Sequence, residues 1–256
     1  MDYKSSYLIS LLVCLAKPCL SNEVQIGVIL PESSHYPWSI QRVLPAINIA
    51  IEYVQNDILP GTRLEILVAD SDCSETKASL AAFELYQKKA HVLLGPVCNY
   101  AVAPVARFST NWNIPIITAG ASVVDFDTKN EFKLLTRIHE TKTLTAESVV
   151  HFTEVFNWTH IGLIYEENVS SAKSECFFTM QAIYFKLMNR YGIAPYSQKF
   201  DKNSDFEDIL RSASSKATVF IVCGNPDSTR ELMIKTHKLG MDRGDYVFIN
   251  IHLENR

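Results

Sequence analysis

Apolar and polar positions along the chain follow two patterns that succeed one another. Residues 24–30 (VQIGVIL) form a short apolar run rich in β-branched side chains, typical of a strand buried on both faces of a parallel sheet. Residues 43–54 instead place apolar side chains three and four positions apart, which predicts an amphipathic helix with Pro45 in its first turn or at a kink. The chain therefore opens with a strand followed by a helix.

The same unit recurs through the first half of the chain. Further strands are predicted over 63–69, 92–94 and 114–118, and helices over 76–89 and 99–112, the latter capped by Asn99. A less regular stretch at 123–140 ends the series. Strands that alternate with helices in this way predict an open parallel sheet with right-handed crossovers.

A second series follows. Helices are predicted over 144–156, 176–191, 205–214 and 228–239, and strands over 160–165, 217–223 and 246–251. The chain is thus expected to be an α/β protein with two Rossmann-like lobes, lobe 1 at 22–138 and lobe 2 at 139–256, and with ligands where strand carboxyl ends face the cleft. Because the second series stops soon after a strand, we expect lobe 2 to be incomplete at its C-terminus.

The first 21 residues differ from the rest. A mostly apolar run at 7–16 is too short to span a bilayer and is followed by Ser21, which predicts a secretory signal peptide at 1–21. A core strand or helix is the alternative, because Asp2 weakens the usual basic start. No other run of about 18 apolar residues occurs, so any membrane attachment would need segments absent from this chain.

Cysteine usage agrees with the secretory route. The chain of 256 residues has six cysteines, and removal of the signal peptide takes away Cys14 and Cys19. The four that remain are Cys73, Cys98, Cys176 and Cys223. An even number suggests two disulfides, with three pairings open. Sequons at Asn157 and Asn168 predict N-glycosylation in the same compartment.

Composition and motifs argue against several function classes. A formal net charge of −4 disfavours a nucleic-acid partner. No dinucleotide, P-loop, zinc-protease or α/β-hydrolase motif occurs, and the seven histidines are scattered, so neither catalytic residues nor a metal site is expected. The acidic groups at 70–72 and 166–167 could form acid/base pairs or bind a hard cation, but solvated loop faces are the commoner explanation.

Several motifs carry a family resemblance. In the first series they are YPWS at 36–39, LGPVCNY at 94–100, APVARF at 103–108 and TAGA at 118–121, and in the second ECFF at 175–178 and GDYVF at 244–248. Over about residues 24–251 they resemble the extracellular ligand-binding domain of natriuretic peptide receptors. The resemblance covers about the first half of such an ectodomain.

This resemblance implies a type I periplasmic-binding-protein bilobe with the pairs Cys73–Cys98 and Cys176–Cys223. It also implies a chloride ion as the one bound cofactor, held by the hydroxyl of Ser39 and the backbone amides of Val97 and Cys98. Amides at a turn before a helix do form anion-binding concavities. Val97 stands where the family usually has glycine, and a helix N-cap is the alternative role for Ser39.

The resemblance further implies a peptide-binding face. Its members would be Glu75, Tyr100 and Arg107 from the first lobe, and Phe177, Phe178 and Phe200 from the second. Rigid aromatic residues and arginine are the types that dominate binding energy in such faces. The alternative is that one or two phenylalanines fill the core, although Phe177 and Phe178, about 100° apart on a helix, cannot both point into one core.

The expected function is therefore that of a non-catalytic, extracellular hormone-binding region. As a homodimer paired through the first lobe, it would signal by rearrangement of the pair to cGMP synthesis in the full-length protein, where any guanylate cyclase lies outside this chain. A bilobed receptor or binding protein for a small amino-acid-like ligand, gripped near Ser122, is the alternative. A secreted α/β enzyme lacks a nucleophile or metal signature.

Overall fold

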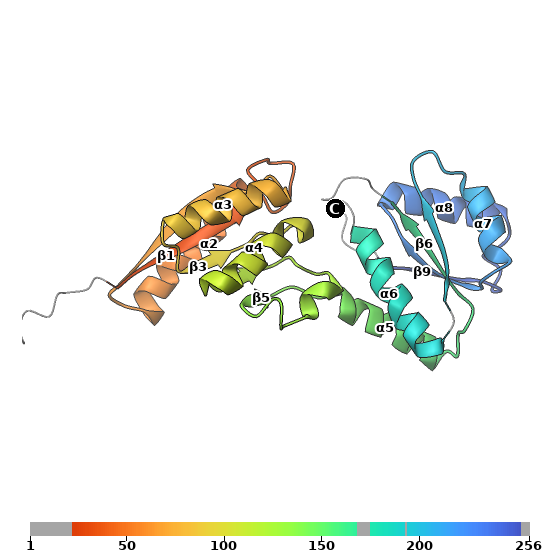
Figure 1. The fold of residues 1–256 in the computed structure, drawn as a ribbon. Helices are drawn as coiled ribbons and strands as arrows, with labels where there is room; N and C mark the ends of the chain where they lie inside the picture. The colour runs from red at the N-terminus through yellow and green to blue at the C-terminus, as the bar shows by residue number, and fades with distance from the viewer. Residues whose placement is uncertain (1–21, 168–174, 193, 252–256) are drawn as a thin grey trace, which may run out of the picture.

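The computed structural model describes residues 22–167, 175–192 and 194–251, which fold around two separate parallel sheets (Figure 1). The predicted signal peptide at 1–21 and the sequon at Asn168 lie outside the described residues. None of the helices in the described residues has the length and apolar character needed to cross a membrane. The α/β class with parallel sheets is confirmed.

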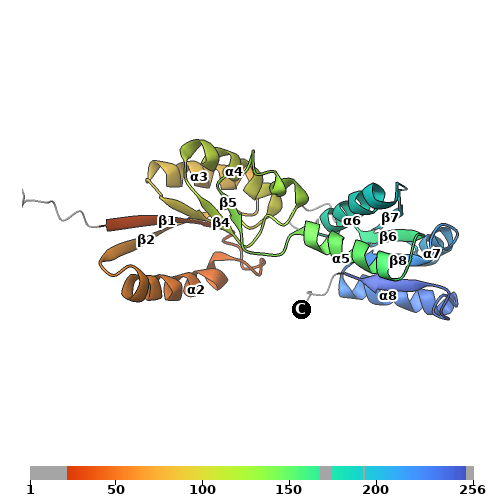
Figure 2. The same ribbon diagram turned by 90° about the horizontal axis from the view of Figure 1, so that it is seen from below.

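The first sheet has the strand order β2-β1-β3-β4-β5. Its strands are β1 (Asn22–Leu30), β2 (Thr62–Asp70), β3 (Val92–Leu94), β4 (Ile116–Thr118) and β5 (Leu135–Arg137). Helix α2 (Ile40–Tyr53), which continues into the π-helical turn η1 (Val54–Ile58), lies on one face; α3 (Glu75–Gln87) and α4 (Asn99–Trp112) lie on the other (Figure 2).

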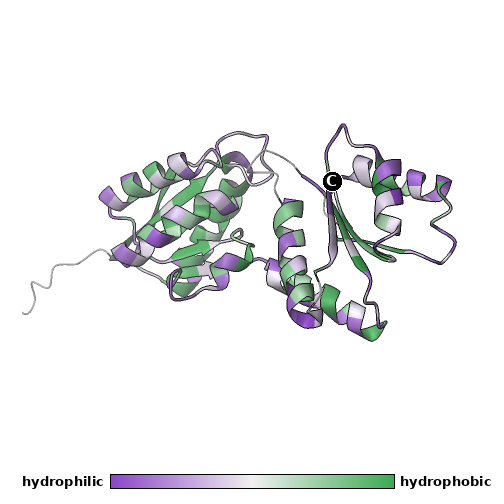
Figure 3. Ribbon diagram, turned by 45° about the vertical axis from the view of Figure 1, so that its right-hand side comes forward, coloured by the Kyte–Doolittle hydropathy of each residue, from purple (hydrophilic) through white to green (hydrophobic). Residues whose placement is uncertain are grey.

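Alternation along β1 supplies both faces of this lobe. Ile26, Val28 and Leu30 pack with the apolar residues of α2, whereas Ile29 belongs to the cluster under α3 and α4. Gly27 faces α3, and a Cβ there would lie 2.7 Å from the side chain of Leu93. The apolar residues gather in the strands and the polar ones on the outer surfaces of the helices (Figure 3).

The second sheet has the order β7-β6-β8-β9. Its strands are β6 (Ile161–Glu166), β7 (Tyr196–Phe200), β8 (Val219–Cys223) and β9 (Val247–Asn250). One apolar cluster packs α5 (Lys142–Val155) and α6 (Glu175–Tyr191) on one face, and another packs α7 (Phe206–Ser214) and α8 (Pro226–Lys238) on the other. The predicted lobe boundary after residue 138 falls in the connection between β5 and α5.

Three sequence predictions need correction. The irregular stretch at 123–140 contains strand β5 and a 3₁₀ turn, η2 (Val124–Asp127), and strand β7 was not predicted. Of the two positions predicted for Pro45, the first turn is excluded, because α2 begins at Ile40 and Pro45 lies inside the helix. Asn99 does not cap α4: the N-cap residue is Cys98, and the Asn99 side chain bonds elsewhere.

The two disulfides are confirmed in the pairing that the resemblance implies. Cys73 bonds to Cys98 and Cys176 to Cys223, each with Cα atoms 5.4 Å apart. The first joins the loop after β2 to the start of α4, and the second joins the first turn of α6 to the end of β8. Each disulfide therefore lies at the carboxyl edge of its own sheet.

Candidate functional site

The loops that leave the carboxyl ends of β1, β3 and β4 meet at one edge of the first sheet. Strands β1 and β3 are hydrogen-bonded neighbours, with Val28 opposite Leu94, so the loop carrying Ser39 and the loop carrying Val97 leave the sheet together. The loop after β4 closes on the second of these, because Thr118 Oγ1 donates to Pro96 O at 2.5 Å. A Cβ on Gly120 would lie 1.9 Å from Val97 O, so this approach requires glycine.

Ser39 is fully buried at this edge, and its hydroxyl has no hydrogen-bond partner among the described residues. Its backbone occupies the N-cap position of α2, but its side chain makes no capping bond, so the N-cap interpretation of the hydroxyl is wrong. The neighbouring indole Nε1 of Trp38 is also buried without a partner. In the described part of the chain the amides of Val97 and Cys98 donate to no protein acceptor.

Buried donors without a partner cost about 1–3 kcal/mol each, so the Ser39 hydroxyl and the Trp38 indole call for an acceptor. A hydroxyl and backbone amides just before a helix suit a small anion, and none of the described residues offers a cluster that could hold a metal ion. Val97 has an ordinary negative-φ backbone, so valine in place of glycine is tolerated there.

The outer face of α4 presents a polar and aromatic strip. Tyr100 and Arg107 lie two helical turns apart on one face, roughly 10 Å along the axis. Tyr100 is 41% exposed, and Arg107 Nε lies 2.5 Å from Glu131 Oε1. The Arg107 guanidinium also lies 5.4 Å from the ring centre of Phe132. Glu131 and Phe132 were not predicted as site residues, because their position beside Arg107 depends on the loop before β5.

Glu75, the other first-lobe candidate, is exposed at the first position of α3, two residues after Cys73. Its carboxylate makes no hydrogen bond or ion pair within the described residues. It lies at the helix N-terminus, where a negative charge is favoured. Glu75 is therefore free to accept from a ligand, in contrast to Glu131.

The second lobe contributes the first turn of α6. Phe178 packs against the apolar cluster of the first lobe, and its ring lies 5.5 Å from that of Tyr100. Phe177 turns toward its own lobe, where its ring lies 6.5 Å from that of Tyr165. Both rings are only partly buried, as the spacing on the helix predicts. Phe178 thus brings the second lobe against the strip on α4.

Phe200 is a correction. It was predicted in the apolar shelf for the peptide, but its side chain is 2% exposed and packs against Phe206, with ring centres 5.1 Å apart. The reason is strand β7, whose alternation turns Phe200 into the core between the sheet and α7. It holds β7 in place and does not reach the surface.

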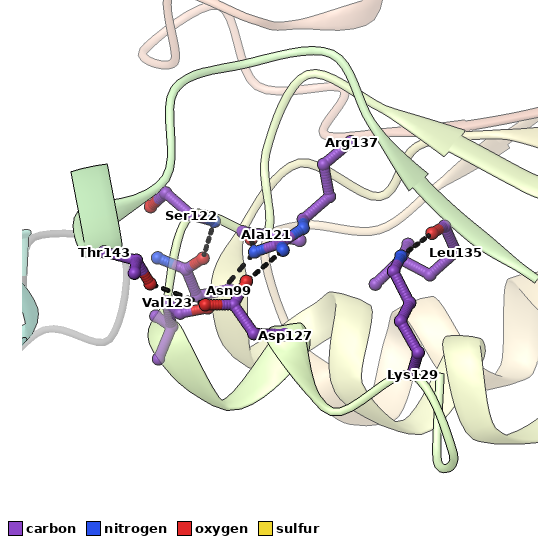
Figure 4. Close-up of polar contacts among 9 residues, drawn as sticks. All are labelled: Asn99, Ala121, Ser122, Val123, Asp127, Lys129, Leu135, Arg137 and Thr143. Atoms are coloured by element: carbon purple, nitrogen blue, oxygen red, sulfur yellow. Dashed lines mark hydrogen bonds and ion pairs between the residues drawn. The ribbon is translucent and has the colours of Figure 1, made fainter. Parts of the chain in front are cut away.

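Polar contacts join the lobes beside this strip. Asn99 Nδ2 of the first lobe donates to Glu175 Oε1 of the second at 3.1 Å, and Lys142 Nζ lies 2.9 Å from Glu175 Oε2 within the second lobe. The Asn99 Oδ1 accepts from the amide of Ser122 at 3.0 Å (Figure 4). That amide is therefore engaged inside the protein and is not available to a small carboxylate ligand.

A second set of polar contacts surrounds Asp127, the last residue of the turn η2. The guanidinium of Arg137 bonds to Asp127 and donates to Ala121 O and Val123 O at 3.2 and 3.4 Å, while Thr143 Oγ1 donates to Asp127 Oδ2 at 2.5 Å. Burial opposes ionisation of Asp127, but these hydrogen bonds and the charge of Arg137 outweigh it and lower the pKa of its carboxyl.

In each acidic group singled out in the sequence, at 70–72 and at 166–167, a carboxylate accepts hydrogen bonds that fix a loop. Asp70 Oδ1 accepts from the amides of Glu32 and Asp72, both at 2.8 Å, and so organises the loop after β2. Glu166 is 5% exposed, which corrects the expectation of a solvated loop face. Both of its carboxylate oxygens accept from Asn225, at 2.8–2.9 Å, and this bond fixes the loop between β8 and α8.

Residues 42–255 match a known family, described as "Receptor family ligand binding region". The chain belongs to this family. It is 32% identical to the human (Homo sapiens) atrial natriuretic peptide receptor 3 over 249 residues, which is 91% of this chain and 45% of that receptor. It is 33% identical to the Bos taurus receptor of the same name, with the same shares covered. The atrial natriuretic peptide receptor 2 of Anguilla japonica is 27% identical over 246 residues, 91% of this chain and 23% of that receptor.

The chain thus spans about half the length, or less, of the curated relatives it matches. Membership of the receptor family agrees with the two parallel-sheet lobes and with the periplasmic-binding-protein-like architecture that the sequence predicts. A ligand-binding region of this family is non-catalytic.

Proposed function

We propose that this chain is the extracellular hormone-binding region of a natriuretic-peptide-type receptor. The relatives that match over 91% of its length are named as receptors for atrial natriuretic peptide. The observation that carries the proposal is the junction between α4 and α6, where Phe178 packs against the exposed Tyr100, on the same helix that presents Arg107 two turns further along. These residue types dominate the energy of peptide interfaces.

The ligand is expected to be a peptide closed by a disulfide ring. Such a ring loses less conformational freedom on binding than an open peptide of equal length, and it can reach both lobes at once. Glu75 supplies a free carboxylate for a basic side chain of the peptide, while Arg107 and Glu131 can exchange their mutual pair for peptide groups. Phe177 and Phe178 supply the apolar contact.

A homodimer through the first lobe is part of the proposal. Four aromatic rings gather on α3 and α4, on the side away from the sheet, with centroid distances of 4.5–5.6 Å. Phe83 and Tyr86 are 42% and 45% exposed. Exposed apolar groups that lie together in this way are typical of an interaction surface. The aromatic cluster consists of Phe83, Tyr86, Phe108 and Trp112. A two-fold pair that buries this cluster would bring two α4 strips near each other, and rearrangement of the pair would signal to a cGMP-producing region in a full-length protein.

Chloride is the expected ion at the carboxyl edge of the first sheet. The buried hydroxyl of Ser39 and the free amides of Val97 and Cys98 suit an anion of this size, and these groups would hold it. A bound anion would satisfy the donors and fix the loop that leads into α4. Tyr100, two residues after Cys98, would then be held in place for the peptide.

Isothermal titration of the chain with a disulfide-ringed natriuretic peptide tests the function. We expect binding to the peptide and none to a panel of amino acids, with affinity reduced when gluconate replaces chloride. Arg107→Ala should weaken binding about 30-fold, corresponding to roughly 2 kcal/mol at a hot spot. Arg63→Ala, which removes a more exposed arginine paired with Glu23 on the far edge of the sheet, is the control. Binding to an amino acid, or equal losses in both variants, would refute the proposal.

The amino-acid-binding alternative gains nothing from the structure. It requires free donors after β4, but the Ser122 amide is bonded to Asn99 and the Ser122 carbonyl accepts from the amide of Lys142 at 2.8 Å. At the junction, Phe178 packs on the first-lobe cluster and Asn99 pairs with Glu175. These contacts at the junction therefore favour a peptide bound on the exposed side of α4 over a small ligand bound between the lobes.

A further inference from the structure

A cavity of about 190 Å³ lies beside the lobe junction, between the turn η2 and the helices α5 and α6. The first lobe lines it with Val123, Val124 and Asp125, and the second lobe lines it with residues of the two helices. Thr143, which is part of the lining, donates from Oγ1 to Asp127 at the end of η2, so a hydrogen bond joins the two sides (Figure 4). An apolar cavity of about 150 Å³ holds benzene, so this one has room for an aromatic ring with a short chain.

The lining is largely apolar, and part of it faces solvent. Phe178 and Phe185 lie seven positions apart on α6, which is about two helical turns, so they share one face of that helix. Ala146 supplies a small, fully buried group from α5. Phe185 and Val124 are 49% and 37% exposed. Large apolar side chains exposed around a cavity favour a ligand with an apolar body.

The charged and polar groups of the lining differ in whether they have a partner. Lys186 Nζ donates to Glu147 Oε1 at 2.8 Å. Asp125 is exposed, and its carboxylate makes no hydrogen bond or ion pair within the described residues. The side chains of Gln181 and Asn189 are likewise exposed and without a hydrogen bond in the described part of the chain. The unpaired charge in the described lining is therefore negative, and the two amides offer their carbonyl oxygens as further acceptors.

These groups match a cation. The N–H donors of an ammonium form charge-assisted hydrogen bonds with a carboxylate, and the faces of phenylalanine rings also attract a positive charge. An anion would be repelled by Asp125, and the ammonium of Lys186 is already paired. A neutral apolar ligand would gain nothing from the carboxylate.

We propose that this cavity binds a small aromatic amine, whose ring packs against Phe178 and Phe185 and whose ammonium pairs with Asp125. The bound amine contacts both lobes, so it favours the arrangement in which they enclose the cavity. It also holds Phe178, whose ring lies 5.5 Å from that of Tyr100, and so acts on the lobe junction. The Ser122 amide is not part of the lining, and the inference does not depend on hormone binding.

Titration of the ¹⁵N-labelled chain with phenethylamine, followed by NMR chemical shifts, tests the site. We expect saturable binding with a Kd of about 1 mM, because phenethylamine has few atoms with which to bind. 2-Phenylethanol has the same size without the charge, and phenylalanine adds a carboxylate to phenethylamine. Both should bind at least about 10-fold more weakly than the amine. Absence of saturable amine binding, or an alcohol or amino acid that binds as tightly as the amine, overturns the proposal.

Three variants locate the binding. Asp125→Asn keeps the size of the side chain and should lower the affinity for phenethylamine to that for 2-phenylethanol. Asp57→Asn is the matched control, because Asp57 is also an exposed carboxylate without a partner in the described residues, and it lies on η1. Phe185→Ala removes a half-exposed ring, so the NMR spectrum should remain that of a folded protein while the amine binds about 10-fold more weakly. An unchanged amine affinity in Asp125→Asn or in folded Phe185→Ala, or an equal loss in Asp57→Asn, overturns the assignment.

Discussion

Replacing Phe178 by alanine tests how the two lobes are held together. A fully buried phenylalanine costs about 3–5 kcal/mol when truncated to alanine, and Phe178 is only partly buried, with one side on the first-lobe cluster. We therefore expect a loss of about 2 kcal/mol in the free energy of unfolding, of which roughly 0.5–1.5 kcal/mol belongs to the ring pair with Tyr100. For a chain of this size the Tm should fall by about 4–8 °C.

Phe177 is the matched control, because it is the same residue type on the next position of α6 and is also partly buried. Its nearest rings are Tyr165 and Phe178, both in its own lobe. Phe177→Ala should therefore lower the free energy of unfolding by no more than about 1 kcal/mol while still weakening the peptide. The two neighbours thus separate stability from binding.

A double-mutant cycle in urea, followed by tryptophan fluorescence, measures the coupling. Tyr100→Ala and Phe178→Ala should deviate from additivity by about 0.5–1.5 kcal/mol, and Tyr100→Ala with Phe177→Ala should be additive. A coupling below about 0.3 kcal/mol between Tyr100 and Phe178 would refute the argument. The rings would then be near each other without contributing to the junction.

Three further changes address other parts of the structure. Glu166→Gln should alter the free energy of unfolding by less than about 1 kcal/mol, because its amide oxygen can still accept from Asn225. Glu166→Ala leaves the Asn225 donors without an acceptor and should lower the free energy of unfolding, measured by chemical denaturation, by about 2–3 kcal/mol. Because the pKa of Asp127 is lowered in the folded protein, its carboxylate stabilises the fold above the ordinary pKa of 3.8, and this contribution disappears as the pH falls below that value. The free energy of unfolding of the wild type should therefore fall more steeply than that of Asp127→Asn between about pH 5 and 3. Parallel curves of stability against pH for the two proteins would contradict this. Gly120→Ala pushes a methyl group into Val97 O and should lower stability by about 3 kcal/mol and reduce the chloride dependence of peptide affinity; a neutral substitution would contradict the close approach.

The sequence predicts the strands that carry a continuous apolar run, and it misses those that do not. The runs within β1 and β8 are rich in β-branched residues, which identifies them as strands. Strand β7 (YSQKF) lies at a sheet edge with only its last residue buried, and β5 (LTR) has three residues. Too little of either strand is buried for a pattern of apolar residues to show it.

The site divides in the same way. Motifs near the cysteines located Tyr100, Arg107 and Phe178, because these residues lie within ten positions of a disulfide. Their partners could not be predicted, since Arg107 pairs with Glu131 across 24 residues and Asn99 with Glu175 across 76. Such pairs arise from packing of whole elements, and Phe200 was misplaced for the same reason: its burial depends on an unpredicted strand.

The junction between the lobes consists of a few contacts of modest strength, and this bears on signalling. Its polar members lie in the first turns of helices: Asn99 at the start of α4 bonds to Glu175 at the start of α6, and Thr143, the second residue of α5, bonds to Asp127. Partly exposed pairs of this kind contribute about 0–1 kcal/mol each, so together with Phe178 they hold the lobes by a few kcal/mol. Two or three hot-spot contacts from a peptide supply a comparable amount. A peptide that binds Tyr100 and Phe178 more tightly in one arrangement of the lobes than in another would therefore have enough free energy to change their relative populations.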